Sequence, residues 1–465
     1  MSELPKGWNV QKFDSIADIV RGVTYKKADS ADFQQDGFMP LYRANNIQSG
    51  SLIESDLVYI PETLVKAAQV IQSGDIVVAM SSGSKSVVGK SAQWFKDHKV
   101  TFGAFCGVLR PNSVLDSKYV GYFTQTRYYR ELLSSLSAGA NINNLKPAYF
   151  GELDFPLAPL AEQKRIVEKL DEVLAQVDTI KARLDGIPAL LKRFRQSVLA
   201  SAVSGKLTEE WRGSANSFDE WKILSIGDIS TVATGKTPKR TNSEYWNSED
   251  VPWLTSSATG DLFCYEAEQF VSSFGARDCK LKRFPIGTLL LAMYGEGKTR
   301  GQVTELMLEA TCNQACAAII VDENKALKSY VKLRLLENYE ETRKAAAGGN
   351  QPNLNLNKVR EISIRLPPKE EQKEIVRLVD QYFAFADTIE VQVKKAQARV
   401  DNLTQSILAK AFRGELVEQD PNDEPADKLL ERIAQARKEA EALAKAAKKA
   451  QSTKSTVKKK VAKSA

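Results

Sequence analysis

Two stretches of the chain carry apolar residues spaced alternately four and three positions apart. In the first stretch these residues are Ile166, Leu170, Val173, Val177, Ile180, Leu184, Ile187, Leu191, Phe194 and Val198. In the second they are Ile375, Val379, Tyr382, Ala386, Ile389, Val393, Ala396, Val400, Leu403 and Ile407. A 3.5-residue period held this long is typical of a coiled coil. We therefore predict two long helices of roughly 60 Å, at ~1.5 Å per residue, that pack on each other. The alternative is two amphipathic helices packed separately on their own domains, which rarely needs so regular a period.

The two stretches are copies of one segment. Residues 159–207 align without a gap with residues 368–416, and 19 of the 49 aligned positions are identical. Such a repeat predicts two copies of one structural unit, and hence pseudo-twofold symmetry. Gly186 and Pro188 occur only in the first copy, where they predict a kink or a brief break.

The remaining segments have a different texture, with short predicted strands and many Gly, Asn and Ser turns. Residues 74–80 and 287–293 each predict a turn followed by a buried strand, so these segments also resemble each other. We expect an α+β protein with two mixed α/β domains separated by two long repeated helices. The expected bounds are 1–157 and 206–366 for the domains, 158–205 and 367–416 for the helices, and 417–465 for a tail.

Composition excludes several classes of protein. No apolar run approaches the roughly 18 residues of a membrane span, and the first residues do not resemble a signal peptide. Five cysteines without regular spacing indicate a reducing, cytoplasmic environment. His98 is the only histidine, so we expect neither a metal site nor a histidine-based catalytic triad.

The net charge of +7 is concentrated at the C-terminal end. Residues 426–465 hold 12 Lys/Arg against 4 Asp/Glu, so the rest of the chain is close to neutral. Any basic surface for nucleic acid must therefore be a local arrangement. We expect the Lys/Ala-rich tail to be partly helical and then disordered, either as a solubilising appendage or as a non-specific phosphate contact.

Three Gly-Lys-Ser/Thr tripeptides, at 89–91, 235–237 and 297–299, suggest nucleotide binding at first sight. A phosphate-binding loop needs another glycine five residues before the second one, and Ser84, Ser230 and Ala292 occupy those positions. No motif for S-adenosylmethionine or for an amino-methyltransferase appears either. We expect no catalytic residues, and hence a protein that is not an enzyme.

The order of domains and helices resembles the specificity subunit of type I restriction-modification enzymes, over nearly the whole chain up to about residue 416. The helical sequences Pro-Leu-Ala-Glu-Gln-Lys at 159–164, Arg-Phe-Arg-Gln at 193–196 and the run 402–416 are similar to conserved regions of that family. The first domain resembles the K-type (type IA) branch through residues 21–27, 43–48, 80–85 and 137–144. The second domain resembles the family more through its layout, and the Lys-rich tail departs from the pattern.

This resemblance implies a non-catalytic, cytoplasmic DNA-binding subunit. Each domain would be a target-recognition domain for one half of a bipartite, asymmetric site in double-stranded DNA, and the helices an antiparallel coiled coil that spaces them. Two methylation (M) subunits would dock on the helices and bring S-adenosylmethionine, and two restriction/translocation (R) subunits would bring ATP and Mg. Charged helix positions such as Lys164, Arg165, Lys169, Lys373 and Arg377 are otherwise expected to be a solvated face.

Loop residues of both domains then become candidate DNA contacts, because Arg and Lys recognise guanine while Asn and Gln recognise adenine in the major groove. In the first domain the candidates are Arg21, Tyr25, Lys26, Arg43, Asn45, Asn46, Gln48, Ser82, Ser84, Lys85, Asn141, Asn143 and Asn144. In the second they are Lys236, Thr237, Lys239, Arg240, Tyr294, Lys298, Arg300, Asn350, Gln351 and Asn353. Turn chemistry alone is the alternative for each Asn/Gly cluster. For the whole chain the alternatives are a cytosolic coiled-coil scaffold whose two domains bind proteins, and an enzyme with an unrecognised site.

Overall fold

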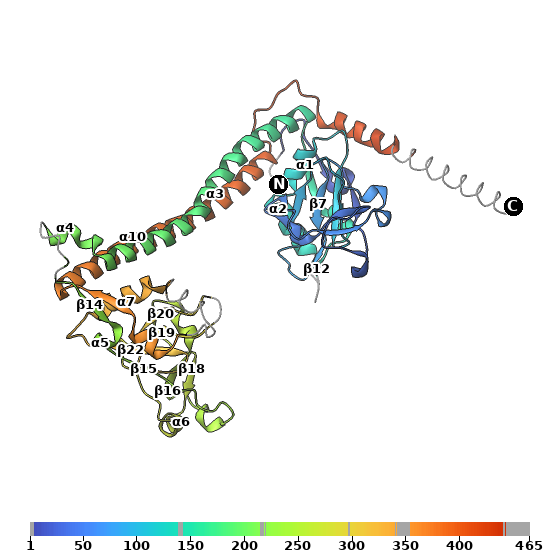
Figure 1. Cartoon of the computed structure of the whole chain (residues 1–465). Helices are drawn as coiled ribbons and strands as arrows, with labels where there is room; N and C mark the ends of the chain where they lie inside the picture. The colour runs from blue at the N-terminus through green and yellow to red at the C-terminus, as the bar shows by residue number, and fades with distance from the viewer. Residues whose placement is uncertain are drawn as a thin grey trace. The chain divides into compact units, whose positions relative to one another are not determined.

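The computed structural model describes residues 4–137, 143–213, 220–295, 298–339 and 354–439, with the single positions 218, 341 and 442. The chain divides into two compact units, Met1–Arg183 with Ala396–Ala465, and Leu184–Lys395. Each unit holds one mixed domain and part of each long helix (Figure 1). None of the described helices combines the length and the hydropathy that a membrane crossing requires.

The first domain is built on a four-stranded sheet of order β2-β11-β7-β9 and a three-stranded sheet of order β10-β3-β6. Their bounds are β2 Ala17–Arg21, β11 Cys106–Pro111, β7 Ile76–Ala79, β9 Ser91–Gln93, β10 Thr101–Phe102, β3 Phe38–Tyr42 and β6 Val58–Pro61. The short pairs are β1 Asn9–Lys12 with β13 Asp154–Leu157, β4 Ile47–Gln48 with β5 Ser51–Leu52, and β8 Ser81–Ser82 with β12 Asn143–Asn144. The helices are α1 Ser117–Phe123 and α2 Arg127–Leu136.

The second domain repeats this topology. Its five-stranded sheet has the order β15-β22-β19-β20-β17 and its three-stranded sheet the order β18-β16-β21. The bounds are β15 Ser230–Thr234, β22 Cys316–Val321, β19 Leu289–Ala292, β20 Val303–Leu306, β17 Phe263–Cys264, β18 Gln269–Val271, β16 Val251–Leu254, β21 Thr311–Cys312, and the pair β14 Lys222–Ser225 with β23 Ser363–Leu366. The helices are α4 Glu209–Arg212, α5 Ile226–Ile229, α6 Ser273–Asp278, α7 Lys328–Glu337 and α9 Leu356–Arg360. The expected buried strands are confirmed, because every residue of β7 and of β19 is buried.

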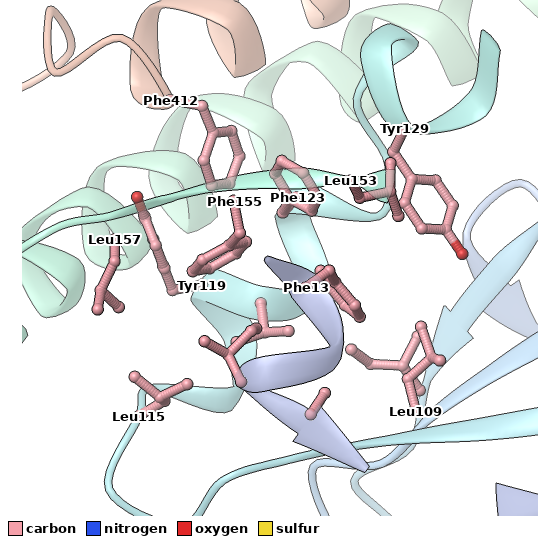
Figure 2. Close-up of a cluster of buried hydrophobic side chains, with 14 of the residues drawn as sticks. Phe13, Leu109, Leu115, Tyr119, Phe123, Tyr129, Leu153, Phe155, Leu157 and Phe412 are labelled. Atoms are coloured by element: carbon pink, nitrogen blue, oxygen red, sulfur yellow. The ribbon is translucent and has the colours of Figure 1, made fainter. Parts of the chain in front are cut away.

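An aromatic cluster forms the core of the first domain, as Figure 2 shows. Phe13 stacks on Phe123 at 5.7 Å between ring centroids, and Phe155 meets Phe123 edge-on at 4.9 Å. Phe412, which directly follows the second long helix, contributes its ring from the far end of the sequence, 5.0 Å from Tyr119. Because aromatic side chains bury large areas, this contact holds the helix end firmly on the domain.

The long helices are α3 (Leu160–Ser204) and α10 (Lys369–Ala411). α3 runs through Pro188 as one continuous helix, so of the expected kink or break the break is absent and the kink stays a prediction. In the first unit, Lys181 Nζ lies 2.7 Å from Asp401 Oδ1. In the second unit, Arg195 Nη2 lies 2.6 Å from Asp387 Oδ1, so residue numbers rise along one helix as they fall along the other. This is the expected antiparallel pairing.

Half of the twenty seam residues are buried, seven are half-buried and three are exposed. Ile166, Leu170 and Val177 of α3 are buried, as are Ile375 and Val379 of α10. By contrast the exposed fractions of Ile180, Tyr382 and Leu403 are 46%, 40% and 48%. The heptad pattern therefore predicts the pairing of the helices, while the burial of each position also depends on which domain lies against it.

The repeated Glu-Gln pair at the start of each long helix attaches the helix to its domain. Trp8 Nε1 donates to Glu162 Oε2 at 2.8 Å. In the second copy Trp221 Nε1 donates to Glu371 Oε2 at 2.9 Å.

The glutamines act alike. Gln163 accepts a hydrogen bond from the Asp116 N–H at the start of α1, which carries the buried Tyr119. Gln372 accepts one from the Leu327 N–H at the start of α7, which carries the buried Tyr330. These four acceptors explain why the sequence repeat begins where it does.

The segment after the second long helix packs on the first domain. Residues 426–439 are helical, and Ala426, Leu429 and Ile433 are buried in the first domain's core. The Ala426 N–H donates to Gly7 O at 2.9 Å, and Arg165 forms a two-pronged ion pair with Asp423, at 2.6 and 3.2 Å. The residues after 416 therefore do not form a uniform tail, because the helix at 426–439 packs on the first domain. Arg165 also belongs to this contact rather than to a solvated face.

Candidate nucleic-acid interface

In the first domain, two of the candidate clusters lie side by side at the end of the buried strand β7. β8 pairs antiparallel with β12, which sets Asn143 opposite Ser82 and Asn144 opposite Ser81. The Asn143 amide also donates to Gly83 O at 3.4 Å. The loop after β7 and the segment before residue 145 therefore form one polar surface, although about 60 residues separate them in sequence.

The Arg43 cluster forms a tight turn after β3. Asn46 is fully buried, its Oδ1 accepts from the Arg43 N–H at 2.9 Å, and its amide donates to Ile53 O and Ser55 O. This corrects the expectation for Asn46, because its polar atoms are used inside the turn. Asn45 and Gln48 are exposed, and Gln48 Nε2 donates to Asn45 O at 3.1 Å.

Two hollows bring these clusters together. The first has a volume of about 680 Å³, and Tyr25, Arg43 and Asn45 line part of it. The second, of about 300 Å³, is lined in part by Arg21 and Asn144. Phe105 lines both hollows, and 69% of its surface is exposed.

Phe105 is not among the candidate residues predicted from the sequence. The signal that could have found it is a large apolar residue in a turn directly before a buried strand.

The other described candidates of the first domain line neither hollow. Lys26 and Lys85 are exposed. Ser84 is also exposed, and its hydroxyl lies 2.9 Å from that of Ser86. Asn141 falls outside the described residues.

The second domain uses the equivalent backbone with different side chains. A Cβ on Gly235 would lie 1.6 Å from Cys312 O, and a Cβ on the equivalent Gly22 would lie 2.1 Å from Gly103 O. Both positions therefore require glycine, because strand and loop approach too closely for a side chain. This close approach accounts for the glycine of the Gly-x-Thr sequence that the two domains share.

Aromatic rings hold the loop that follows Gly235. The guanidinium of Arg240 lies 3.9 Å from the Trp246 ring centroid and 4.6 Å from that of Trp253, and it donates to Gln269 Oε1 at 2.6 Å. Such stacking fixes the orientation of an arginine and leaves some of its donors for a ligand. Lys236, Thr237 and Lys239 are exposed on the same loop.

A hollow of about 360 Å³ lies beside this loop and includes acidic residues that sequence analysis did not select. Asp261, Glu266 and Glu268 line it together with Trp253 and Gln269. Carboxylates accept hydrogen bonds from the N4 amino group of cytosine, so an acidic lining is compatible with contacts to bases. The signal was present in the sequence as three carboxylates within eight residues.

The remaining candidates of the second domain follow β19. Tyr294 and Arg300 are half-buried, and Lys298 is exposed. The Arg300 guanidinium donates to Gly295 O at 3.4 Å. Asn350, Gln351 and Asn353 fall outside the described residues.

Cys106 lines the first domain's two hollows, and burial raises the pKa of its thiol to about 12, so the thiol is not a nucleophile at neutral pH. Among the residues that the structure describes, no three His, Cys, Asp or Glu side chains gather closely enough to hold a metal ion. His98 packs edge-on against Trp94, at 4.9 Å.

Comparison with known proteins agrees with this architecture. A family model for the type I restriction modification DNA specificity domain matches residues 5–189 and 218–397. The chain is 41% identical over 454 residues to the StySPI specificity subunit of Salmonella potsdam, with 94% of this chain and 96% of that relative covered. It is 40% identical over 457 residues to the EcoKI specificity subunit of Escherichia coli K12, with the same two coverages.

Two solved structures share the fold. A chain from work on complex assembly and conformational transition of the type I R-M system has a TM-score of 0.69 at 19% identity, covering 90% of this chain and 100% of that chain. The HsdS subunit of Thermoanaerobacter tengcongensis has a TM-score of 0.55 at 19% identity, covering 89% and 98%. At these identities the likeness concerns the fold alone. Taken with the sequence matches, it identifies the chain as a member of the type I restriction-modification specificity subunits, in the K-type branch.

Proposed function

We propose that the two loop surfaces described above recognise the two halves of a bipartite, asymmetric DNA target, one half by each domain. The observation that carries this proposal is that the two domains share one backbone framework but present different side chains on it. Equivalent glycines occupy the close approaches at 22 and 235, whereas Arg43 and Asn45 line the hollow of the first domain and acidic residues line that of the second. Unlike side chains on a shared framework suit two unrelated half-sites.

The chain itself performs no catalysis in this proposal. Methylation and restriction subunits supply the chemistry, with S-adenosylmethionine, ATP and Mg bound by those partners. The repeated helix pair supports two M subunits, because two copies of one surface suit two identical partners. Two R subunits complete the complex in the same ratio.

The experiment is to co-express the chain with the methylation subunit of the same system and to map methylated adenines by single-molecule sequencing of the host DNA. The expected result is one motif made of two specific parts with a non-specific gap. A chimera carrying the first domain of the EcoKI subunit should change one part of the motif and leave the other part intact. Methylation without a common motif, or binding to DNA without sequence preference, would favour the scaffold alternative.

A further inference from the structure

A pair of backbone hydrogen bonds occurs at the same place in both domains. In the first domain, Phe105 O accepts from the Met80 N–H at 2.8 Å and from the Ser81 N–H at 3.1 Å. In the second domain, Ala315 O accepts from the Met293 N–H at 2.8 Å and from the Tyr294 N–H at 3.4 Å. The two bridges are equivalent, because each joins the end of the buried central strand to the residue before the next strand of the sheet.

In both domains one side of this bridge carries a small residue and the other an aromatic residue, but the two sides are reversed. The first domain has a small residue, Ser81, on one side and an aromatic one, Phe105, on the other. The second domain has aromatic Tyr294 on the first side and small Ala315 on the other. Each bridge therefore carries one aromatic and one small residue, on opposite sides in the two domains. Phe105 is exposed, whereas Tyr294 is half-buried and packs against the second domain's core.

Phe105 is both rigidly held and exposed. Its backbone carbonyl is held by two N–H groups, while its ring leaves 69% of the residue's surface in solvent. A single exposed aromatic residue is common on protein surfaces. The position of Phe105 is unusual because it lines both hollows of the candidate interface, between Arg43 and Asn45 on one side and Arg21 and Asn144 on the other.

We propose that Phe105 determines specificity by packing against the C5 methyl group of a thymine in the half-site of the first domain. This inference rests on the proposed function. Among the base edges of the major groove, the thymine methyl is the apolar group that an aromatic ring recognises, whereas the neighbouring Arg and Asn side chains suit guanine and adenine. Phosphate oxygens offer a phenyl ring no comparable contact.

The test uses deoxyuridine, which pairs like thymine but lacks the methyl group. Once the target is mapped, each thymine of the first half-site, on either strand, is replaced in turn in a duplex. Binding is then measured for the complex of this chain with its methylation subunit. At one position we expect the wild type to lose about fourfold in affinity, the value of one buried methyl group. Phe105→Ala should weaken binding to the unmodified duplex more strongly than this and should be insensitive to deoxyuridine at that same position.

A matched control is Phe95→Ala, which removes an exposed ring that follows β9 at the opposite end of β7 from Met80. This variant should keep both the affinity and the deoxyuridine effect of the wild type. Phe105→Leu, which keeps an apolar side chain, should retain part of the discrimination.

The inference is overturned if Phe105→Ala binds like the wild type, if it remains as sensitive to deoxyuridine, or if the half-site contains no thymine. A wild-type complex that does not distinguish its target from a scrambled duplex would instead refute the proposed function.

Discussion

At the scale of single residues, the equivalent glutamates of the two repeat copies, Glu162 and Glu371, have different electrostatic environments. Glu371 is buried and pairs with the Arg212 guanidinium, whose side chain is only 9% exposed. Glu162 is buried at the equivalent position, but its closest donors are the neutral groups of Trp8 and Gln419. Burial raises the pKa of Glu162 above its ordinary value of 4.5. The ionised form of Glu162 is therefore disfavoured where α3 meets the first domain. Where α10 meets the second domain, the cation of Arg212 compensates the charge of Glu371.

Replacing each of these glutamates by glutamine should therefore change the stability of the two helix–domain junctions by different amounts. At pH 7, Glu371→Gln should destabilise its junction by about 3 kcal/mol, because Arg212 is left buried without a counter-charge. Glu162→Gln should change stability by less than about 1 kcal/mol, because the amide keeps an acceptor for Trp8. Hydrogen exchange of peptides around Trp221 and Trp8 measures each junction separately. Equal losses of protection in the two variants would contradict this account.

The raised pKa of Glu162 also sets a dependence on pH. Below about 4.5 the carboxyl is protonated in both the folded and the unfolded chain, and the stability it contributes is fully present. That stability is lost as the pH rises through the raised pKa of the folded state. The stability of the wild type relative to Glu162→Gln should therefore fall between pH 4.5 and neutral pH, as measured by denaturant unfolding. A difference that stays constant or rises over this range would contradict the sign.

Lys85 offers a test of the loop after β8. If it contacts a phosphate, Lys85→Ala should reduce the slope of log K against log salt by ~0.9, because one fewer counterion is released. Lys12 lies 2.7 Å from Asp154 at the junction with the long helix, so Lys12→Ala is the control that should leave the slope unchanged. Filter binding or fluorescence anisotropy across a salt series measures both variants.

At the scale of elements, the segment after α10 is a structural part of the first domain. Residues 205–213 complete the second domain's junction through Arg212, and residues 414–433 occupy the corresponding place on the first domain through Gln419 and Ile433. The sequence repeat ends at 416, so it gave no indication of this second role. The helix at 426–439 is held by buried apolar residues, and its charge does not explain its position.

Truncation separates the two parts of this segment. Removing residues 440–465 should leave the thermal stability of the first domain unchanged. Removing residues 420–465 should lower it by several degrees or more, because Ala426, Leu429 and Ile433 leave the core and Arg165 loses Asp423. Differential scanning calorimetry of both truncations provides the measurement. Equal stability of the chain lacking residues 420–465 and the full chain would show that the packed helix contributes little.

At the scale of the whole molecule, we propose that the helix pair sets the spacing between the two recognition surfaces. Insertion of one heptad in α3 between 184 and 191, with a matching heptad in α10 between 389 and 396, preserves the antiparallel seam. At ~1.5 Å per residue, this lengthens the pair by roughly 10 Å, which corresponds to about three base pairs. We expect the mapped methylation motif to keep both specific parts and to gain about three base pairs in its gap. A motif with the original gap would refute the role of the helices as spacer.

By itself, the sequence determined the duplication, the two long helices and the buried strands β7 and β19. These features depend on local periodicity and on repeated spacing, which can be read directly from the amino-acid sequence. Only the tertiary structure decided that Asn46 belongs to a turn, that Phe105 stands between two hollows, and that Phe412 and Ile433 complete the first domain. Such facts depend on contacts between residues far apart in the chain, and no local pattern encodes which distant backbone will satisfy a given side chain.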